Sequence, residues 1–475
     1  MHVVFVIPPF DYARSVGNVR RRSRSGVLPP LGVGFLASAL GARGHTSALV
    51  DAMAEQFNVE ETVDAVLAAK PELVGLSIMT LLARDAARDV VDGLRGRQPG
   101  LPIVLGGPHV MAAGPQVLED IAADYAVPGE GEAPLSALVD CLSKGENIAN
   151  VAGLYYRDAT LRAVETPARA HERNLDVFAP PDRRLYKPGL YQALPSLNLG
   201  RHVTTVITSR GCPWARCAFC HQGSGCSVPF RRRSPEHVAD EVEALVRDWG
   251  VRSVVFWDDN FCVMPRWVDR FCGMLDARGL RITWSVLARA DTVTPDMLRR
   301  MAKSGCYSIQ FGFESGVQET LDMIRKGTTL EQYRKAVRWS RDAGLEVRGS
   351  FMLGFPGETP EMSLSTIDFA CELNADYMLF FAYHVLPGTA LEERALAEGR
   401  VVAQEGEFNI HMPTYVPYTY PDAETLADMV RRAYRQYYMR PAYAAQALRR
   451  LLRRPSLIRN HLVGLVYWAG LALRP

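Results

Sequence analysis

Two long stretches of the chain alternate short apolar runs with segments in which apolar residues recur at helical spacing. In residues 1–135 the apolar runs are VVFVI, TSALVDA, LVGLSIM and PIVLGGP, and helical segments such as LGVGFLASALGARG lie between them. Strands separated by amphipathic helices predict an α/β fold with a doubly wound parallel sheet of Rossmann type. Ligands of such sheets bind outside the carboxyl ends of the strands, so the turns after these runs are candidate binding positions.

The same alternation returns over residues 201–390. Six apolar runs there have the character of strands, namely HVTTVITS, SVVFWDD, ITWSVLA, SIQFGFES, EVRGSFML and YMLFFAY. Helices are predicted between them, over residues 235–249, 265–278, 295–304 and 330–343. Six strand–helix units predict a partial parallel (β/α)6 barrel. Residues 136–200 are less regular and are predicted to form a connector, and residues 391–475 are predicted to form a helical C-terminal region.

The amino-acid composition excludes several classes of protein. The 475 residues are 48% hydrophobic and 22% charged, which is ordinary globular composition. The net charge of +2 gives the chain no strong positive electrostatic field that would favour the binding of nucleic acid. Nine cysteines, an odd number, argue against a secreted disulfide scaffold and for a reducing, cytoplasmic compartment. The N-terminus has no basic start or long apolar run, and no stretch of about 18 apolar residues predicts a membrane span.

Three cysteines lie close together in the segment TSRGCPWARCAFCHQG. Cys212, Cys217 and Cys220 follow a predicted strand in a glycine-bearing loop. Three thiolates at this spacing suit an iron–sulfur cluster or zinc. Structural zinc usually takes four ligands, and no second CxxC pair occurs in the sequence. Cys226 is a candidate fourth ligand, but we favour three ligands that leave one iron open, and we expect the other five cysteines in or near the core.

This cysteine segment resembles that of the radical S-adenosylmethionine (SAM) enzymes, whose cysteines are separated by three and then two residues. Here the first gap, Pro213–Arg216, is four residues long. The resemblance implies a [4Fe–4S] cluster whose open iron binds SAM, and a 5′-deoxyadenosyl radical that abstracts hydrogen from the substrate. It also implies SAM contacts at successive strand ends: Asp258, Asp259 and Asn260 for the amino group, Arg289 for the carboxylate, Glu314 and Ser315 for the ribose.

Residues 1–135 are similar to the cobalamin-binding domain that precedes many radical SAM enzymes. The similarity rests on the segments LPPLGVGFLASALGARGH, LVDA, LVGLSIMT, VLGGPH and GEGE. It implies that two turns line the cobalamin, with Ser77, Thr80, Gly106 and Gly107 as candidate contacts. The alternative is a domain that keeps this fold and binds no cobalamin, since turns of small residues also serve folding.

These similarities imply a cobalamin-dependent radical C-methyltransferase that acts on a small molecule, such as a specialised metabolite or a lipid. The alternatives are radical dehydration of a sugar diol, an oxidative ring closure without cobalamin, or a non-catalytic iron–sulfur electron-transfer module. An external electron donor of the flavodoxin or ferredoxin type is implied. Residues 429–475 hold ten arginines and no acidic residue. They predict either an amphipathic helix on an anionic membrane surface or a packed terminal helix with a solvated basic face.

Overall fold

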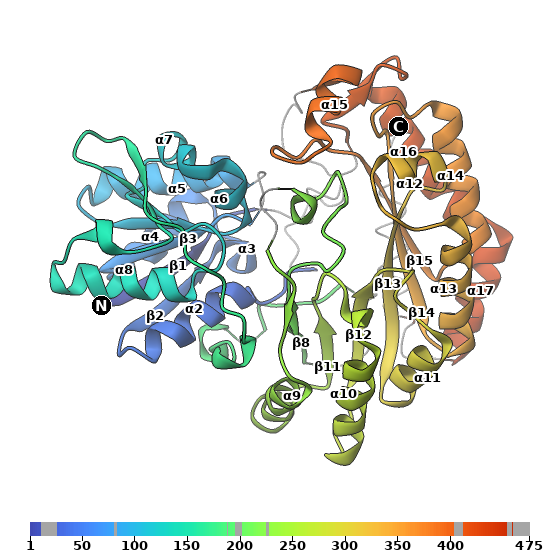
Figure 1. Ribbon diagram of the computed structural model, residues 1–475, viewed down its shortest axis with the longest axis horizontal. Coiled ribbons are helices and arrows are strands. Elements are labelled where there is room, and N and C mark those ends of the chain that lie inside the picture. The colour runs from blue at the N-terminus through green and yellow to red at the C-terminus, as the bar shows by residue number, and fades with distance from the viewer. Residues whose placement is uncertain are drawn as a thin grey trace. The chain divides into compact units, whose positions relative to one another are not determined.

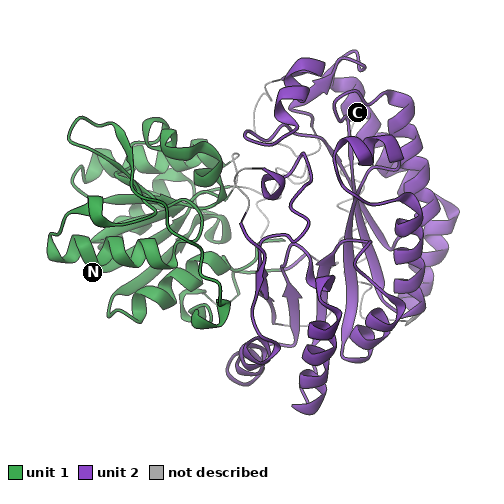
Figure 2. Ribbon diagram, viewed as in Figure 1, with its two compact units in different colours: residues 1–12, 22–192 green, residues 13–21, 193–475 purple. Residues whose placement is uncertain are grey.

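Two compact units make up the chain (Figure 2). The computed structural model describes residues 1–10, 26–79, 83–187, 189–194, 202–224, 228–402, 412–453 and 458. Unit 1 comprises residues 1–12 and 22–192, and unit 2 comprises residues 13–21 and 193–475. The two predicted sheets therefore belong to separate units; the sheet of unit 1 has a hydrophobic core on each face, and unit 2 has a core of its own.

Unit 1 is built on a seven-stranded sheet with the order β2-β1-β3-β4-β5-β6-β7. Its strands are β1 (His2–Ile7), β2 (Thr46–Asp51), β3 (Leu73–Ser77), β4 (Ile103–Gly106), β5 (Tyr125–Ala126), β6 (Tyr155–Arg157) and β7 (Ala163–Glu165). The first five are parallel, whereas β6 and β7 pair antiparallel. The segment expected to be a connector over 136–200 thus contributes a hairpin, which extends the sheet because β6 pairs with β5.

Helices cover both faces of this sheet. They are α2 (Leu31–Gly41), α3 (Ala52–Glu55), α4 (Val59–Ala68), α5 (Arg84–Arg97), α6 (Pro108–Ala113), α7 (Val117–Asp120) and α8 (Glu132–Lys144). Val4 and Val6 of β1 share a core with α4 and α5, whereas Val3 and Phe5 share a core with α2 and α8. Successive residues of β1 enter opposite cores, as expected for a strand that is buried on both faces. The predicted doubly wound sheet is confirmed.

Unit 2 contains a six-stranded, wholly parallel sheet with the order β15-β14-β13-β12-β11-β8. Its strands are β8 (Val203–Val206), β11 (Ser253–Phe256), β12 (Thr283–Ala288), β13 (Cys306–Glu314), β14 (Glu346–Leu353) and β15 (Tyr377–Ala382). A short antiparallel pair, β9 (Ser209–Arg210) and β10 (Arg231–Arg232), follows β8. The spatial order of the main strands follows the chain, and within the described residues β8 and β15 do not pair. The predicted partial (β/α)6 barrel is confirmed.

The crossover helices of unit 2 lie outside this sheet (Figure 1). They are α9 (Pro235–Trp249), α10 (Pro265–Ala277), α11 (Pro295–Lys303), α12 (Gln318–Met323), α13 (Leu330–Asp342) and α14 (Pro360–Leu373). The Ser234 and Thr294 side chains accept a hydrogen bond from the first turn of α9 and α11, and a proline follows each. Such a cap satisfies a free amide, and proline at the first helical position loses no hydrogen bond. Both helix starts therefore coincide with their predicted positions.

The region after β15 is mostly helical, as predicted, but it also contains two short strands. It forms α15 (Glu392–Glu398), the antiparallel pair β16 (Gly399–Val401) and β17 (Tyr415–Pro417), α16 (Ala423–Tyr438) and α17 (Pro441–Arg453). The Tyr438 hydroxyl accepts from the Met378 amide (2.9 Å) and donates to the Met378 carbonyl (2.7 Å). The Tyr434 hydroxyl accepts from the Phe380 amide (3.1 Å). Helix α16 therefore satisfies main-chain groups of β15 that face away from β14.

The basic C-terminal segment is described only in part. Arg450 of α17 forms a buried ion pair with Asp376 (3.0 Å), so this arginine packs against the sheet. A membrane-surface helix was one expectation for residues 429–475, and of these, residues 454–457 and 459–475 lie outside the described residues. None of the described helices combines the length and the apolar character that crossing a membrane requires.

Candidate functional site

The three clustered cysteines lie on a loop that follows the carboxyl end of β8, and all three are half-buried. Two glycines fix the course of this loop. Gly211 has a φ of +79°, and a Cβ there would lie 2.3 Å from the Val228 carbonyl oxygen. A Cβ on Gly223 would lie 2.1 Å from the Cys217 carbonyl oxygen. The backbone therefore packs on itself where any side chain beyond hydrogen would clash.

The thiols of the loop are electrostatic neighbours. Burial is the main cause that raises the pKa of Cys220 to about 11, and the thiols of Cys217 and Cys212 act in the same direction. Within the described residues, no three His, Cys, Asp or Glu side chains converge on a single metal-ion position. A four-iron cluster needs no such convergence, because each thiolate binds a different iron atom. Three neighbouring thiols on this loop therefore fit a [4Fe–4S] cluster.

Of the six remaining cysteines, five lie within the residues that the structure describes and one does not. Cys141, Cys262, Cys272 and Cys306 are buried and Cys371 is half-buried. These positions agree with the expectation of core or near-core residues. Cys226, considered as a fourth ligand, lies outside the described residues.

Asp258 and Asp259 follow β11, but only Asp258 is buried, with 1% exposure. Its Oδ1 accepts hydrogen bonds from the Thr208 amide and hydroxyl (2.9 Å each) and from the Ser209 hydroxyl (2.5 Å). Its Oδ2 has no partner among the described residues. Burial raises the pKa of Asp258. Asp258 therefore fixes the segment that leads into the cysteine loop and keeps one acceptor unused.

Arg232 is a half-buried cation beside Asp258 that was not predicted from the sequence. Its guanidinium carbon lies 3.6 Å from the centre of the Trp267 ring and 5.0 Å from that of Phe261. Burial lowers the pKa of Arg232 to about 10, and the attraction of Asp258 opposes this shift. In the sequence, the run of three arginines at 231–233 was the signal that could have pointed to Arg232. The position of Arg232 beside Asp258 becomes evident only in the structure, because the pairing of β9 with β10 brings Arg232 back to the end of β8.

Asn260 and Arg289 connect the ends of β11 and β12. Asn260 Oδ1 accepts from the Arg289 amide (3.3 Å), while its Nδ2 has no partner among the described residues. The Arg289 guanidinium donates to Asp291 through Nε and Nη2 (3.0 Å each), and Nη2 also donates to the Lys326 carbonyl (2.8 Å). Its Nη1 lies 4.0 Å from Cys217 Sγ. Arg289 is thus held against the cysteine loop with one nitrogen directed to it.

Glu314 and Ser315 end β13 with different surroundings. Glu314 has a φ of +66° and accepts from Lys326 Nζ (2.8 Å), in a pair whose side chains are 13% and 8% exposed. The Ser315 side chain is fully buried and contacts the Thr366 hydroxyl (3.4 Å). Glu314 therefore reaches the Arg289 region through Lys326, whereas Ser315 is hydrogen-bonded in the interior. Lys326 was not predicted, because it follows a helix and not a strand.

In unit 1, the candidate cobalamin contacts lie at the carboxyl ends of paired strands. Ser77 ends β3 and Gly106 ends β4, and the two residues are register partners. A Cβ added to Gly106 would meet no atom within 4 Å, so the space beside it is open. Gly107 differs, because its φ is +97° and a Cβ there would lie 2.6 Å from the Ile78 carbonyl oxygen. Thr80 lies outside the described residues. The open position at Gly106 fits a ligand that lies across the strand ends, such as a corrin.

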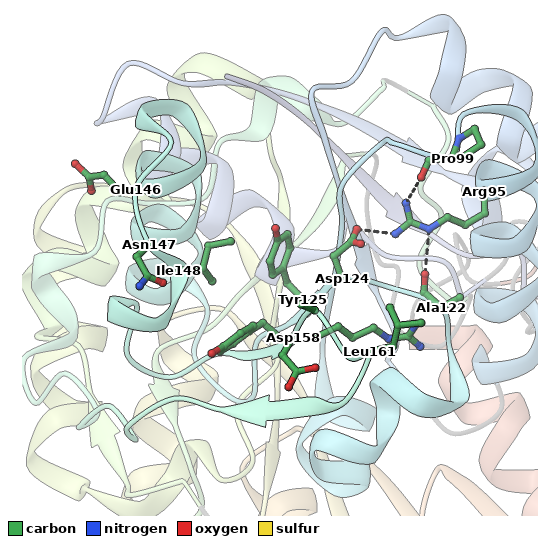
Figure 3. Close-up of a pocket in the computed structure, with 13 residues that line it drawn as sticks. Arg95, Pro99, Ala122, Asp124, Tyr125, Glu146, Asn147, Ile148, Asp158 and Leu161 are labelled. Carbon is green, nitrogen blue, oxygen red and sulfur yellow. Dashed lines mark hydrogen bonds and ion pairs between the residues drawn. The ribbon is translucent and has the colours of Figure 1, made fainter.

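A pocket of about 760 Å³ lies at the opposite, amino-terminal edge of the same sheet (Figure 3). Tyr125, the first residue of β5, and Arg95 belong to its lining. Arg95 donates to the Asp124 carboxylate (2.6 Å) and to the carbonyls of Pro99 (3.0 Å) and Ala122 (3.1 Å). Its guanidinium is therefore engaged in joining the segments around β5, and this pocket is distinct from the edge at Gly106.

Two family models match the chain. The model of the radical SAM superfamily matches residues 206–370, which contain the cysteine loop and the strand ends at Asp258, Arg289 and Glu314. The model of the B12 binding domain matches residues 17–139, which contain Ser77 and Gly106. The radical SAM match falls in unit 2, and the B12-binding match falls in unit 1 from residue 22 onwards.

Relatives and solved structures match over nearly the full length. The chain is 30% identical over 444 residues, 93% of each protein, to an uncharacterized methyltransferase of Pyrococcus horikoshii. It is 29% identical over 452 residues to the anaerobic magnesium-protoporphyrin IX monomethyl ester cyclase of Rubrivivax gelatinosus, covering 93% of this chain and 78% of the relative. The radical SAM methyltransferase TsrM from Kitasatospora setae, solved with cobalamin and a [4Fe–4S] cluster, shares the fold, with a TM-score of 0.68 at 19% identity over 92% of this chain and 85% of that one. The chain is therefore a radical SAM enzyme of the family that carries a B12 binding domain, and its cofactors are a [4Fe–4S] cluster, SAM and cobalamin.

Proposed function

We propose that the enzyme methylates a carbon atom of a small molecule by cobalamin-dependent radical chemistry. The observation that supports this most is the presence, in one chain, of a three-cysteine loop in a radical SAM sheet and an open strand end in a B12-binding sheet. Besides the relative from Pyrococcus horikoshii, the cytidylyl-2-hydroxyethylphosphonate methyltransferase of Streptomyces wedmorensis is 25% identical over 471 residues, 86% of each protein. A specialised metabolite or a lipid is the expected substrate class.

The bound cofactors supply a 5′-deoxyadenosyl radical and a methyl group, and the residues of the chain bind and orient them. In this proposal Cys212, Cys217 and Cys220 hold the cluster as thiolates. Asp258 Oδ2, a buried acceptor without a partner among the described residues, receives the ammonium group of SAM. Arg289 Nη1, which contacts no carboxylate or carbonyl in the part of the chain that the structure describes, donates to the SAM carboxylate. Charge-assisted hydrogen bonds of this kind fix orientation as well as affinity.

The same proposal assigns supporting roles to the other residues that were predicted to contact SAM. Asn260 Nδ2 is a buried donor for which the described residues provide no partner, and Asp259 is exposed beside Cys220. Glu314 is assigned to the ribose, since its carboxylate lies at the strand end next to Lys326. Ser315 is assigned to positioning, because its hydroxyl lies against Thr366. The electron for SAM cleavage comes from an external flavodoxin- or ferredoxin-type donor.

The test uses the anaerobically reconstituted enzyme with and without cobalamin, incubated with SAM and a low-potential reductant. We expect 5′-deoxyadenosine in both samples and S-adenosylhomocysteine only in the sample that holds cobalamin. A fully reduced cluster that yields no 5′-deoxyadenosine would contradict the radical assignment. Formation of 5′-deoxyadenosine without S-adenosylhomocysteine in the cobalamin-loaded enzyme would contradict methyl transfer.

The relative from Rubrivivax gelatinosus favours a second candidate, an oxidative ring closure. That relative is named a cyclase and matches 93% of this chain, so the same two units occur in an enzyme with a different product. Ring closure transfers no methyl group. The experiment above therefore separates the two functions by the presence or absence of S-adenosylhomocysteine.

A further inference from the structure

Trp214 is the second residue of the four-residue gap between the first two cysteines, and its side chain packs on the turn between α12 and α13, residues 324–327. The indole N–H donates to the Arg325 carbonyl (3.0 Å). Gly327 has a φ of +68°, and a Cβ there would lie 2.0 Å from the indole ring. Only glycine leaves room for the indole against this backbone. One hydrogen bond and one close backbone contact therefore fix the indole on the turn.

The backbone of the gap is strained where it leaves Trp214. Ala215 has a left-handed φ of +42°, which residues with a Cβ rarely adopt. Such a conformation persists where contacts fix the chain on both sides of it. Before Ala215 these are the contacts of Trp214, and after it the Ala218 amide donates to the Ile324 carbonyl (2.9 Å). The loop therefore bears local strain while Trp214 stays on the turn.

The same indole contacts the Arg289 guanidinium, whose carbon atom lies 4.7 Å from the ring centre. Arg289 is buried, with 6% exposure. Two acceptors restrain one edge of the guanidinium, because Asp291 accepts from Nε and Nη2 (3.0 Å each) and the Lys326 carbonyl accepts from Nη2 (2.8 Å). The indole adds an attraction of a different kind, since the face of an aromatic ring attracts a cation within about 6 Å. Both restraints act while Nη1 lies 4.0 Å from Cys217 Sγ.

We propose that Trp214 is a positioning residue that holds the Arg289 guanidinium in the orientation that receives the SAM carboxylate. The inference rests on the contact between Arg289 and SAM given under the proposed function. Hydrogen bonds along one edge still allow the guanidinium plane to tilt, and a tilt that moves the cation away from the indole loses the cation–π attraction. An arginine whose plane is already fixed loses less conformational freedom when it binds a carboxylate, so the affinity for SAM increases.

A double-mutant cycle on Trp214 and Arg289 tests the inference. Full-length wild type, Trp214→Leu, Arg289→Met and the double variant are reconstituted anaerobically. Their affinity for SAM is measured by equilibrium dialysis without a reductant, so that no SAM is cleaved. We expect Trp214→Leu to bind SAM about tenfold more weakly than wild type, which is the size of a desolvated cation–π contact. In the Arg289→Met background the same change should weaken binding by less than about twofold, because the contact that Trp214 positions is already absent.

Three further variants complete the experiment. Trp214→Phe keeps an aromatic face and lacks the indole N–H, so it should bind SAM more tightly than Trp214→Leu. Trp249→Leu is the matched control, because Trp249 is the last residue of α9 and is 43% exposed, and its affinity should equal that of wild type. If Trp214→Leu takes up no iron, Gly327→Ala replaces it in the cycle, because the added Cβ displaces the indole without removing it.

The outcomes separate this inference from the proposed function. An equal loss of affinity with and without Arg289 would show that Trp214 only supports the loop, and it would overturn the inference. So would wild-type affinity in an iron-loaded Trp214→Leu, or a Trp214→Phe that binds as weakly as Trp214→Leu. None of these results touches the proposed function. Unchanged affinity in Arg289→Met would instead overturn the contact between Arg289 and SAM, and with it the inference.

Discussion

Each thiolate of the cysteine loop is expected to be indispensable for the cluster. Loss of Cys212, Cys217 or Cys220 by change to alanine removes the protein ligand of one iron atom, so the cluster should no longer assemble. Iron and sulfide analysis after anaerobic reconstitution measures this directly. Cys371→Ala, at a half-buried position on α14, is the control that keeps its iron. Cys226→Ala is also expected to keep its iron, and an equal loss there would contradict three-cysteine ligation.

Asp258→Asn tests the proposed contact with the ammonium group of SAM. Charge-assisted hydrogen bonds contribute about 1.5–3 kcal/mol, so the variant should bind SAM about 10- to 100-fold more weakly. Equilibrium dialysis with the cluster-loaded chain measures the affinity, and iron content shows whether the bonds to Thr208 and Ser209 still hold the loop. Asp248→Asn, an exposed change on α9 where Asp248 pairs with Arg247, is the control. Unchanged affinity in Asp258→Asn would contradict the assignment.

Glu358 makes the stability of unit 2 depend on pH. It lies after β14 with 1% exposure and accepts from the Phe355 amide (3.2 Å) and the Ser363 hydroxyl. Burial raises its pKa from 4.5 to about 7. The folded state therefore binds this proton more tightly than the unfolded state. The resulting stabilisation is complete below the unfolded pKa and is lost as the pH rises through about 7, to an extent of about 3 kcal/mol.

Glu358→Gln should remove most of this pH dependence. The difference in the free energy of unfolding between about pH 5 and about pH 8 is expected to shrink by up to about 3 kcal/mol relative to wild type. Denaturant unfolding at the two pH values measures the difference. Glu319→Gln, at an exposed position on α12, is the matched control. An identical pH dependence in Glu358→Gln and wild type would refute the prediction.

The elements that sequence could locate are those whose signals are local. Helix α9 begins where a serine cap precedes a proline, and β14 has the predicted bounds because an apolar run is flanked by polar segments. Strands β6 and β7 have three residues each, and what identifies them is pairing with β5 and with each other. Pairing partners distant in sequence leave no local periodicity, so these residues were expected to be a connector.

The same distinction applies to the candidate site. Asp258, Arg289 and Glu314 could be proposed because the chain resembles the radical SAM enzymes, which contact SAM at the carboxyl ends of successive parallel strands. Lys326 and Arg232 could not, because neither follows a strand of the main sheet. Lys326 comes from a turn between two helices, and Arg232 from the short β9–β10 pair.

Helix α16 takes the place of a neighbouring strand along β15. Tyr434→Phe removes the acceptor of the buried Phe380 amide, which should lower the free energy of unfolding by about 1–3 kcal/mol. Hydrogen exchange at the Phe380 amide is expected to become faster, and the thermal midpoint to fall. Tyr418→Phe is the control, because that side chain is 63% exposed. Unchanged exchange at Phe380 would show that the hydroxyl does not protect β15.

At the scale of the whole molecule, the proposal divides the cofactors between the two units. Gly106→Leu should fold, because a Cβ at Gly106 meets no atom, yet its side chain would enter the open space beside β4. We expect the affinity for cobalamin to fall at least about tenfold, which corresponds to a loss of about 1.4 kcal/mol or more in binding free energy. The iron content should be unchanged. Visible absorption and metal analysis measure both. Gly41→Leu, also at an open glycine, is the control, and unchanged cobalamin affinity in Gly106→Leu would refute the assignment of this edge.

Strand β15 ends the sheet of unit 2 without leaving the main-chain groups of Met378 and the amide of Phe380 free. Edge strands with free groups are templates on which another chain can add a strand, and this is a common route to aggregation. A tyrosine hydroxyl satisfies such a group but presents no further ladder of amides and carbonyls behind it. The sheet can therefore remain an open partial barrel, while its edge around Met378 and Phe380 is blocked against the addition of a strand from another chain.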